Sequence, residues 1–313
     1  MIIKISKKIF MHLINLKTFI LFLSVVFFYN QVEAQQLYKV SNYMDHSFIN
    51  NPAAVGAHGF ATVGVAYRNQ WSGIEGGPVT TVIFGDTYLS KMSTGLGIVL
   101  YSDKTGPTSR SGAEINFSYS VKLDDINNKR IMFGMGGEIL QFKVDKSKIA
   151  DAIPNDPLLS SSGSTIKADA NAGIYCRSNT LNFGVSAKQL IQPKLNFIKT
   201  TTNPEGRLYR HYMATASYNI KTDEDNVLQP HFEIRFQSNA PTDYEGGVTL
   251  YHKDKFHFGA SAHYKQAYTI FAGVKIEDKF SINYAYDVYN NPIGIFETGY
   301  AAHEIMLRYL FVK

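Results

Sequence analysis

Beyond residue 60 the chain alternates apolar and polar residues in about fourteen stretches of roughly ten residues each. In the clearest stretch, 113–122, Ile115, Phe117 and Tyr119 alternate with serine, asparagine and lysine. A period of two indicates β-strands with unlike faces, and a soluble sandwich has shorter strands of about five or six residues. The pattern therefore predicts an all-β fold, a transmembrane antiparallel β-barrel of about 14 strands with lipid outside. The side chains expected to face lipid include Ile115, Phe117, Tyr119, Leu181, Phe183, Val185, Ile282, Tyr284 and Tyr286.

The first 34 residues have the pattern of a secretory signal peptide. A lysine-rich start is followed by a short apolar run, 18–28, and by a small-residue cleavage site that ends at Ala34. The alternative is a membrane anchor, but the run is short of the ~20 apolar residues that a spanning helix needs. Four lysines and one glutamate lie in this region, so the rest of the chain has a net charge of +2 instead of +5. No basic footprint for nucleic acid remains.

The remaining chain is expected to form one domain, with an N-terminal periplasmic segment at 35–59 followed by the barrel at 60–313. A barrel must close, because an open edge in lipid leaves backbone groups without hydrogen bonds. The single cysteine, Cys176, excludes an internal disulfide and is expected on the lipid face as an apolar filler. The expected strands are approximately 60–69, 79–88, 94–103, 110–122, 130–144, 166–177, 180–190, 208–221, 227–238, 243–253, 256–266, 268–277, 280–289 and 303–312.

The lengths of the connections predict the orientation of the barrel. Every second connection is a short polar turn, such as Thr222–Asn226, whereas the long ones at 146–165, 191–207 and 290–302 all fall at the opposite end. Outer-membrane barrels have short periplasmic turns and longer extracellular loops. We therefore expect the long connections to be extracellular and the segment 35–59 to form a folded lid at the periplasmic side, tucked into the lumen or docked on a ring protein.

No constellation of catalytic residues is recognisable, and we expect no catalytic, cofactor-binding or metal-binding residues. The sequence has no nucleophile elbow, no zinc-protease motif and no phosphate loop. His257 and His263 share a strand face but are about 20 Å apart, too far to ligate one ion. Charges of both signs on the polar face indicate paired side chains inside the barrel.

Two charged residues are expected to meet where the barrel closes. Arg68 points inward near the end of the first strand, and Glu304 points inward near the start of the last strand. We predict that they form an ion pair, or a hydrogen bond through one intermediary, that is screened by water at the rim and worth ~1 kcal/mol or less if exposed. The simpler interpretation is that the pair stabilises the barrel, and the more specific hypothesis is that it acts as a functional latch. Trp71, the only tryptophan, lies in the glycine-rich loop after the first strand and is expected to cap the same rim.

A set of ordered motifs resembles one known family. The motifs are Ser41-Asn42-Tyr43-Met44, Asn50-Asn51-Pro52-Ala53-Ala54-Val55-Gly56, Tyr67-Arg68-Asn69-Gln70-Trp71-Ser72-Gly73 with Gly77-Pro78, Gly95-Leu96-Gly97, and His303-Glu304-Ile305. Together they resemble the PorP/SprF family of the type IX secretion system of the Bacteroidota, from about residue 36 onward. As candidates for partner binding, the resemblance marks Asn51, Pro52, Arg68, Trp71, Gly73, Gly77, Pro78, His303 and Glu304.

The resemblance implies a non-enzymatic outer-membrane protein that assists export or anchors secreted cargo, such as adhesins, sometimes in support of gliding motility. Its implied partners are outer-membrane lipid, periplasmic ring components of the secretion machine and the C-terminal domain of secreted cargo. The resemblance leaves open whether the chain is a core component or a cargo-specific paralogue. Two alternatives remain, a solute channel of the porin or fatty-acid-transporter type and an outer-membrane lipid hydrolase.

Overall fold

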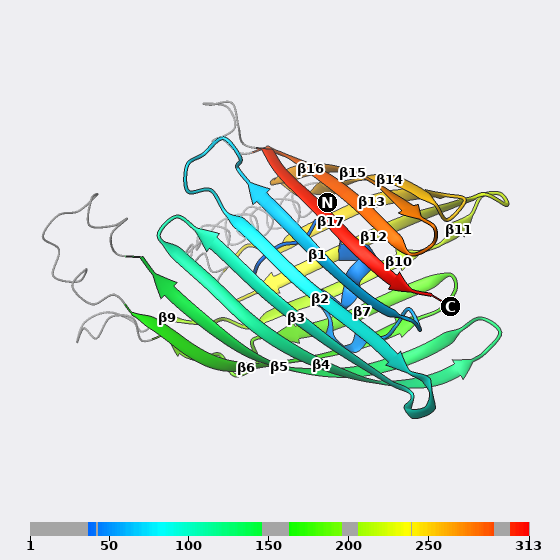
Figure 1. Cartoon of the computed structure of the whole chain (residues 1–313), viewed down its shortest axis with the longest axis horizontal. Coiled ribbons are helices and arrows are strands. Elements are labelled where there is room, and N and C mark those ends of the chain that lie inside the picture. The colour runs from blue at the N-terminus through cyan, green and yellow to red at the C-terminus, as the bar shows by residue number, and fades with distance from the viewer. Residues whose placement is uncertain are drawn as a thin grey trace, which may run out of the picture.

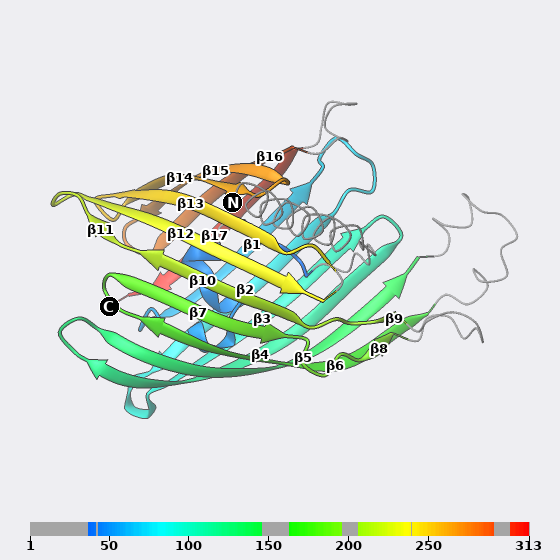
Figure 2. The same cartoon turned by 180° about the vertical axis from the view of Figure 1, so that it is seen from behind.

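The structure is a computed structural model that describes residues 37–41, 43–145, 163–195, 206–238, 240–290 and 301–312. It is a closed antiparallel barrel of tilted strands (Figures 1 and 2). The predicted signal peptide lies outside the described residues. No helix in the described part of the chain is long and apolar enough to span a membrane.

The strands match the predicted ones closely. They are β1 (Ala61–Gln70), β2 (Val79–Leu89), β3 (Thr94–Thr105), β4 (Thr108–Asp124), β5 (Lys129–Val144), β6 (Ser164–Arg177), β7 (Leu181–Lys188), β8 (Lys194–Leu195), β9 (Gly206–Arg207), β10 (His211–Tyr218), β11 (Ile220–Lys221), β12 (Asn226–Gln237), β13 (Asp243–His252), β14 (Phe256–His263), β15 (Ala267–Ile276), β16 (Phe280–Tyr289) and β17 (Ala301–Phe311). The expected strand 208–221 is interrupted at Asn219, whose backbone N–H donates instead to the Thr180 carbonyl. Counting β10 and β11 as one spanning strand, and leaving out the short β8–β9 ribbon, the barrel has 14 strands.

The barrel closes where its first strand meets its last. Each spanning strand pairs with its sequence neighbours, so that β10 pairs with β12, and β1 pairs antiparallel with β17 along its whole length. Closure leaves the spanning strands without a free edge across the membrane, which the lipid core demands. The predicted 14-stranded barrel is thus confirmed.

The predicted lipid face is apolar and points outward. Ile115, Phe117 and Tyr119 are 67%, 43% and 50% exposed in the isolated chain, while Asn116 and Ser118 between them are fully buried in the lumen. The same alternation runs through β7 and β16. Cys176 is half-buried and free, on the outward face of β6. Large apolar side chains exposed in an isolated chain are those that lipid covers in the membrane.

The two ends of the barrel differ, and we name them by their connections. The turn end carries the short connections that include Ser90–Met92 and residues 222–225, and β1 begins and β17 ends there. The loop end carries the connection 71–78. Residues 146–162, 196–205 and 291–300, which make up most of the long connections, lie outside the described residues, although their flanking strands place those connections at the loop end.

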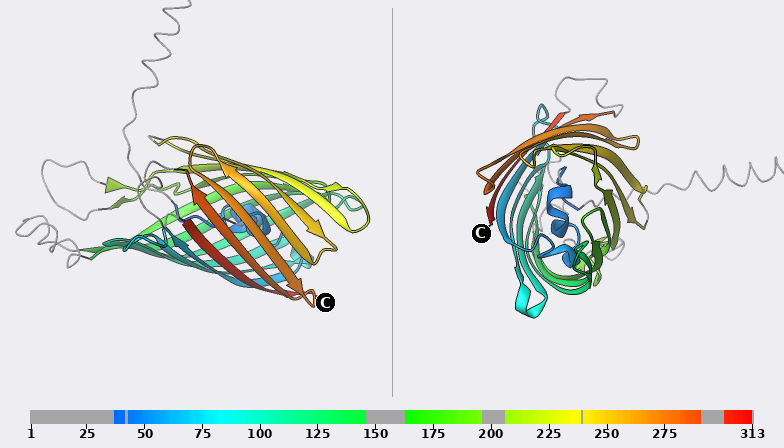
Figure 3. Two further views of the ribbon diagram at one scale, coloured as in Figure 1. Left: turned by 90° about the horizontal axis from the view of Figure 1, so that it is seen from above. Right: turned by 90° about the vertical axis from the view of Figure 1, so that its right-hand side faces the viewer.

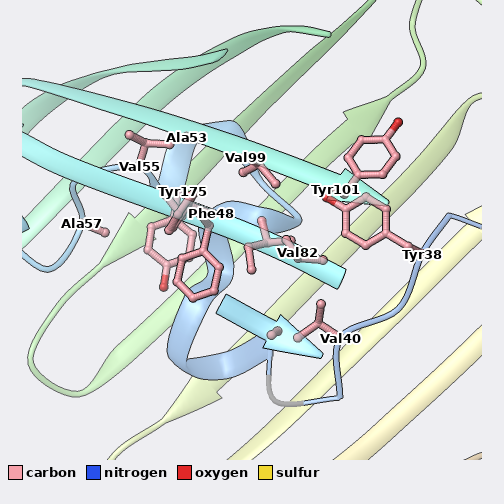
Figure 4. Packing of buried hydrophobic residues seen from close by; sticks show 14 of the residues in the cluster. Tyr38, Val40, Phe48, Ala53, Val55, Ala57, Val82, Val99, Tyr101 and Tyr175 are labelled. Atoms are coloured by element: carbon pink, nitrogen blue, oxygen red, sulfur yellow. The ribbon is translucent and has the colours of Figure 1, made fainter. Parts of the chain in front are cut away.

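The lumen is occupied by the segment that precedes β1. Residues 37–41 and 43–58, including the short 3-10 helices η1 (Tyr43–Ile49) and η2 (Pro52–Ala54), lie inside the ring of strands (Figure 3). Their apolar side chains form the main buried cluster together with inward residues of β1, β2, β3, β5, β6 and β17 (Figure 4). In this cluster Phe48 and Ile49 are no more than 2% exposed, and Phe48 packs edge-on against Phe84 of β2. The polar interior of a barrel is therefore combined here with an apolar core supplied by the plug.

Candidate functional site: the plugged lumen and its loop-end rim

The predicted ion pair at the barrel seam is present, but it is buried. Arg68 of β1 and Glu304 of β17 are register partners, and Arg68 Nη1 lies 3.4 Å from Glu304 Oε2. The two side chains are only 3% and 2% exposed. The expectation of a water-screened rim pair is therefore wrong, because the lumen segment and neighbouring strands cover both charges.

Asp287 and Ser41 also belong to this seam cluster. Asp287 of β16 pairs with Arg68 Nη2, and Ser41 of the lumen segment accepts a hydrogen bond from Arg68 Nη1. The Ser41 backbone N–H donates to Glu304 Oε2 at 2.7 Å. One guanidinium thus compensates two buried carboxylates, and the lumen segment supplies additional donors. Removing one member leaves the others buried without full compensation, which is costly at low dielectric.

The Asn51-Pro52 motif anchors the plug to the barrel wall. The Asn51 side-chain oxygen accepts from the Ala53 backbone N–H at 3.0 Å and so caps η2, which begins at Pro52. Its amide nitrogen donates to the carbonyls of Ile174 in β6 and Val185 in β7, at 3.1 and 3.3 Å. Pro at the first helical position fits because its missing N–H would have no helical partner. Asn51 and Pro52 therefore serve the internal structure of the lumen.

Inward-facing glycines of the wall allow the plug backbone to approach closely. A Cβ on Gly134 would overlap the backbone of Ala53, and a Cβ on Gly95 would overlap the Val55 carbonyl. A Cβ on Gly173 would overlap the Asn51 side chain in the same way. We call Gly95, Gly134 and Gly173, with Gly184 of β7, the glycine wall. Only Gly95 stood out in the sequence, as part of the Gly95-Leu96-Gly97 motif.

The connection after β1 forms the rim above the seam. Trp71 adopts a left-handed backbone conformation (φ 56°), and its ring packs edge-on against Tyr289 with the centroids 6.3 Å apart. Gly77 is held so close to the carbonyls of residues 70 and 71 that a Cβ would meet them at 2.7 and 2.9 Å. Pro78 accepts a hydrogen bond from the Gln70 N–H at 2.8 Å, which closes the loop, whereas Gly73 is exposed.

His303 does not join Glu304 in the lumen. Its side chain lies on the outer surface, where Nδ1 is 2.7 Å from the Tyr284 hydroxyl. Strand alternation explains this, because adjacent residues of β17 point to opposite faces. The structure thus brings together Arg68, Glu304 and the rim at Trp71. Asn51 and Pro52 lie deeper, and His303 faces lipid.

A cavity of about 540 Å³ opens beside Trp71 at the loop end. Leu37, Tyr38 and Lys39 of the lumen segment line it, together with Arg110 and the rim residues. Another cavity of about 140 Å³, lined by residues such as Phe48, Ala57 and Arg177, lies toward the turn end. The two cavities share no lining residue, since the packed plug separates them. We call the larger cavity the vestibule.

The buried charges of the lumen are paired, as expected from their mixed signs. Lys188 Nζ lies 3.0 Å from Glu114 Oε2 and also donates to the Ile49 carbonyl of the plug at 2.7 Å. Arg110 lies 3.6 Å from Glu138, and Arg235 pairs with Glu233. The Lys188–Glu114 pair braces the wall against the plug, whereas Arg110 also lines the vestibule.

One cluster combines serine, glutamate and histidine without the geometry of a hydrolase. Ser261 donates to Glu245 Oε1 at 2.9 Å, and His263 Nε2 lies 3.0 Å from Glu245 Oε2. Lys39 Nζ approaches the same histidine at 3.0 Å from Nδ1. In a catalytic triad the histidine stands between serine and acid and takes the serine proton. Here the serine donates directly to the acid, so nothing activates it.

In the part of the chain that the structure describes, no three histidine, cysteine, aspartate or glutamate side chains are grouped to hold a metal ion. His257 instead lies against the Tyr251 ring, with centroids 5.5 Å apart.

Comparisons with known proteins agree with this architecture. A family model described as type IX secretion system membrane protein PorP/SprF matches residues 32–309. A search of curated proteins finds no significant match. Among solved structures, the Ralstonia pickettii toluene transporter TbuX is similar with a TM-score of 0.52 and 10% identity, over 85% of this chain and 93% of that chain. The P. putida toluene transporter TodX is similar with a TM-score of 0.51 and 8% identity, over 84% and 93% of the two chains. At such identities the likeness concerns the fold alone.

Proposed function

The chain belongs to the PorP/SprF family of type IX secretion membrane proteins, and we propose that it assists export and holds secreted cargo at the cell surface without enzymatic activity. The family and the barrel fold place it in the outer membrane. The observation that carries the proposal is the plug. Residues that would line a conducting lumen are instead packed against Phe48, Ile49 and Val55.

The proposed orientation puts the turn end in the periplasm and the loop end outside the cell. Short turns face the periplasm in outer-membrane barrels. In this orientation the turn end meets the periplasmic ring components of the secretion machine. The loop end, with Trp71 and the vestibule, receives the C-terminal domain of the secreted cargo. When the cargo is an adhesin, its retention there supports gliding motility.

Trp71 is the side chain best placed to test the cargo face. It lies at the rim of the vestibule beside Tyr289, and aromatic side chains in such positions often dominate binding. The test is to fuse a cargo C-terminal domain to a fluorescent protein and to measure the fraction retained on intact cells. Trp71→Ala should lower this fraction at least fivefold, and Trp71→Phe should restore part of it.

The matched control is Ile126→Ala at the turn end, where the side chain is 89% exposed. It should leave the retained fraction unchanged. Equal retention by wild type and Trp71→Ala, with equal amounts of barrel in the outer membrane, would show that cargo does not bind at this rim.

The solute-channel alternative has a direct electrical test. A packed plug predicts that the purified protein in a planar bilayer conducts no ions above background. Steady single-channel steps of the size of an open barrel would favour the channel reading.

A further inference from the structure

The lumen segment runs through the barrel from one end to the other. At the turn end, the Ala57 carbonyl accepts a hydrogen bond from Arg177 at the end of β6, at 2.6 Å. At the loop end, the Tyr38 ring packs on Tyr101 of β3 with the centroids 4.6 Å apart. Leu37 lines the same vestibule as Trp71.

This passage separates the two ends of the described chain. β1 begins at Ala61, which is the register partner of Phe311 near the end of the chain, so both lie at the turn end. Leu37, only 24 residues before Ala61, lies at the loop end. A barrel with an even number of strands normally leaves both termini on the periplasmic side. Here the lumen segment acts as one additional crossing and puts Leu37 at the opposite end from Phe311.

The crossing is fixed by specific contacts along its length. Ser41 belongs to the buried seam cluster near the loop end, Asn51 bonds to the carbonyls of two wall strands, and the Gly56 N–H donates to Asp86 at 2.8 Å. Phe48 and Ile49 are almost fully buried between these points. A segment held at so many positions does not slide, so Leu37 is fixed at the loop end, in the vestibule that Trp71 also lines.

We infer that the chain enters the barrel from the outer surface of the cell, so that Leu37 lies at the face proposed to receive cargo while Phe311 lies at the periplasmic end. The inference rests on the orientation proposed above for its absolute direction, but the separation of Leu37 from Phe311 follows from the passage alone. Arg68 and Glu304 both bind Ser41 across the seam, so the lumen segment is tied to both strands that close the barrel.

Single-cysteine labelling tests the inference on the full chain. In a Cys176→Ala background, we would compare Gln36→Cys with Glu75→Cys in the exposed loop after β1 and Glu224→Cys in an exposed turn at the other end. Residue 36 adjoins Leu37, so chain geometry keeps its Cα within about 3.8 Å of that of Leu37. A bulky, membrane-impermeant maleimide is applied to intact cells and to cells with a permeabilised outer membrane.

Gln36→Cys and Glu75→Cys should both be labelled on intact cells, and Glu224→Cys at least tenfold less until the membrane is permeabilised. If Gln36→Cys is instead labelled like Glu224→Cys, only after permeabilisation, the passage through the lumen is refuted. If Gln36→Cys is labelled like Glu75→Cys but both need permeabilisation, the passage through the lumen is supported and the proposed orientation is wrong. The inference that Leu37 lies at the cell surface is then wrong as well. A Gln36→Cys protein that reacts only after unfolding would also contradict the inference that the chain enters the barrel from the outer surface.

Discussion

Arg68 and Glu304 face each other across the closure of the barrel, and both are shielded from water by a segment that comes from neither strand. Arg68 Nη1 lies 3.4 Å from Glu304 Oε2. Arg68 Nη2 lies closer to the second carboxylate of the cluster, Asp287. The Ser41 N–H, 2.7 Å from Glu304, ties the plug to this cluster. Closure of the wall and occupation of the lumen are thereby coupled at one point.

Arg68→Ala should therefore destabilise the barrel severely. It leaves Asp287 and Glu304 buried with their main counter-charge removed, a change that costs roughly 3–5 kcal/mol for buried pairs. The measurement is the temperature at which the folded barrel, which migrates faster in a detergent gel, converts to the unfolded form. A shift no larger than that of Lys122→Ala, whose pair with Asp125 is exposed and worth roughly 0–1 kcal/mol, would contradict the account.

Exchanging the two charges should not rescue this loss. In the double variant Arg68→Glu with Glu304→Arg, the new glutamate lies beside Asp287, so two carboxylates face each other in a buried site. The double variant should be no more stable than Arg68→Ala in the same gel assay. Recovery to wild-type stability would mean that Asp287 does not share this cluster.

Gly134→Ala should disturb the plug without touching the lipid face. Its Cβ would overlap the Ala53 backbone, and overpacking of this kind costs roughly 1–3 kcal/mol. The control is Gly137→Ala on the same strand, which has no atom within 4 Å of its Cβ. Limited proteolysis of the purified protein should cut within 37–58 faster in the first variant only. Equal cutting of both variants would show that the wall does not hold the plug.

Phe117→Arg should impair membrane insertion. Phe117 lies midway along the outward face of β4, and arginine at the bilayer midplane of a barrel costs roughly 2–4 kcal/mol. The amount of folded barrel recovered in lipid vesicles should fall, whereas Ile126→Arg in a turn should give a wild-type yield. Normal yield from Phe117→Arg would argue that this face does not meet lipid.

Alternation was sufficient to predict the wall, because lipid and lumen impose opposite polarity on successive residues. It also placed Arg68 and Glu304 inward and adjacent, since the first and last strands of a barrel must pair. It could not show that Asp287 joins them, although Asp287 has inward parity on β16, because reach across two strands depends on side-chain conformation. The pattern also did not predict that the lumen segment crosses the barrel from end to end, because a segment without hydrophobic periodicity gives no indication of its path.

The glycine wall illustrates the same limit. Gly134, Gly173 and Gly184 interrupt the inward polar series, and such gaps in a strand indicate close approach of another backbone. The sequence alone does not name the approaching segment, which here comes from Asn51 and its neighbours. The interruption of the expected strand at Asn219 has a similar origin, since that residue bonds to the turn at Thr180.

The central claim is that this plugged barrel retains secreted cargo at the cell surface, and deletion of its gene tests that claim most directly. Cargo bearing a type IX C-terminal domain would be quantified in the surface, periplasmic and medium fractions of wild-type, deletion and complemented cells. The account predicts that surface cargo falls at least tenfold in the deletion strain, accumulates in the periplasm or medium, and returns on complementation. Unchanged surface cargo, with other outer-membrane proteins equally abundant, would contradict it.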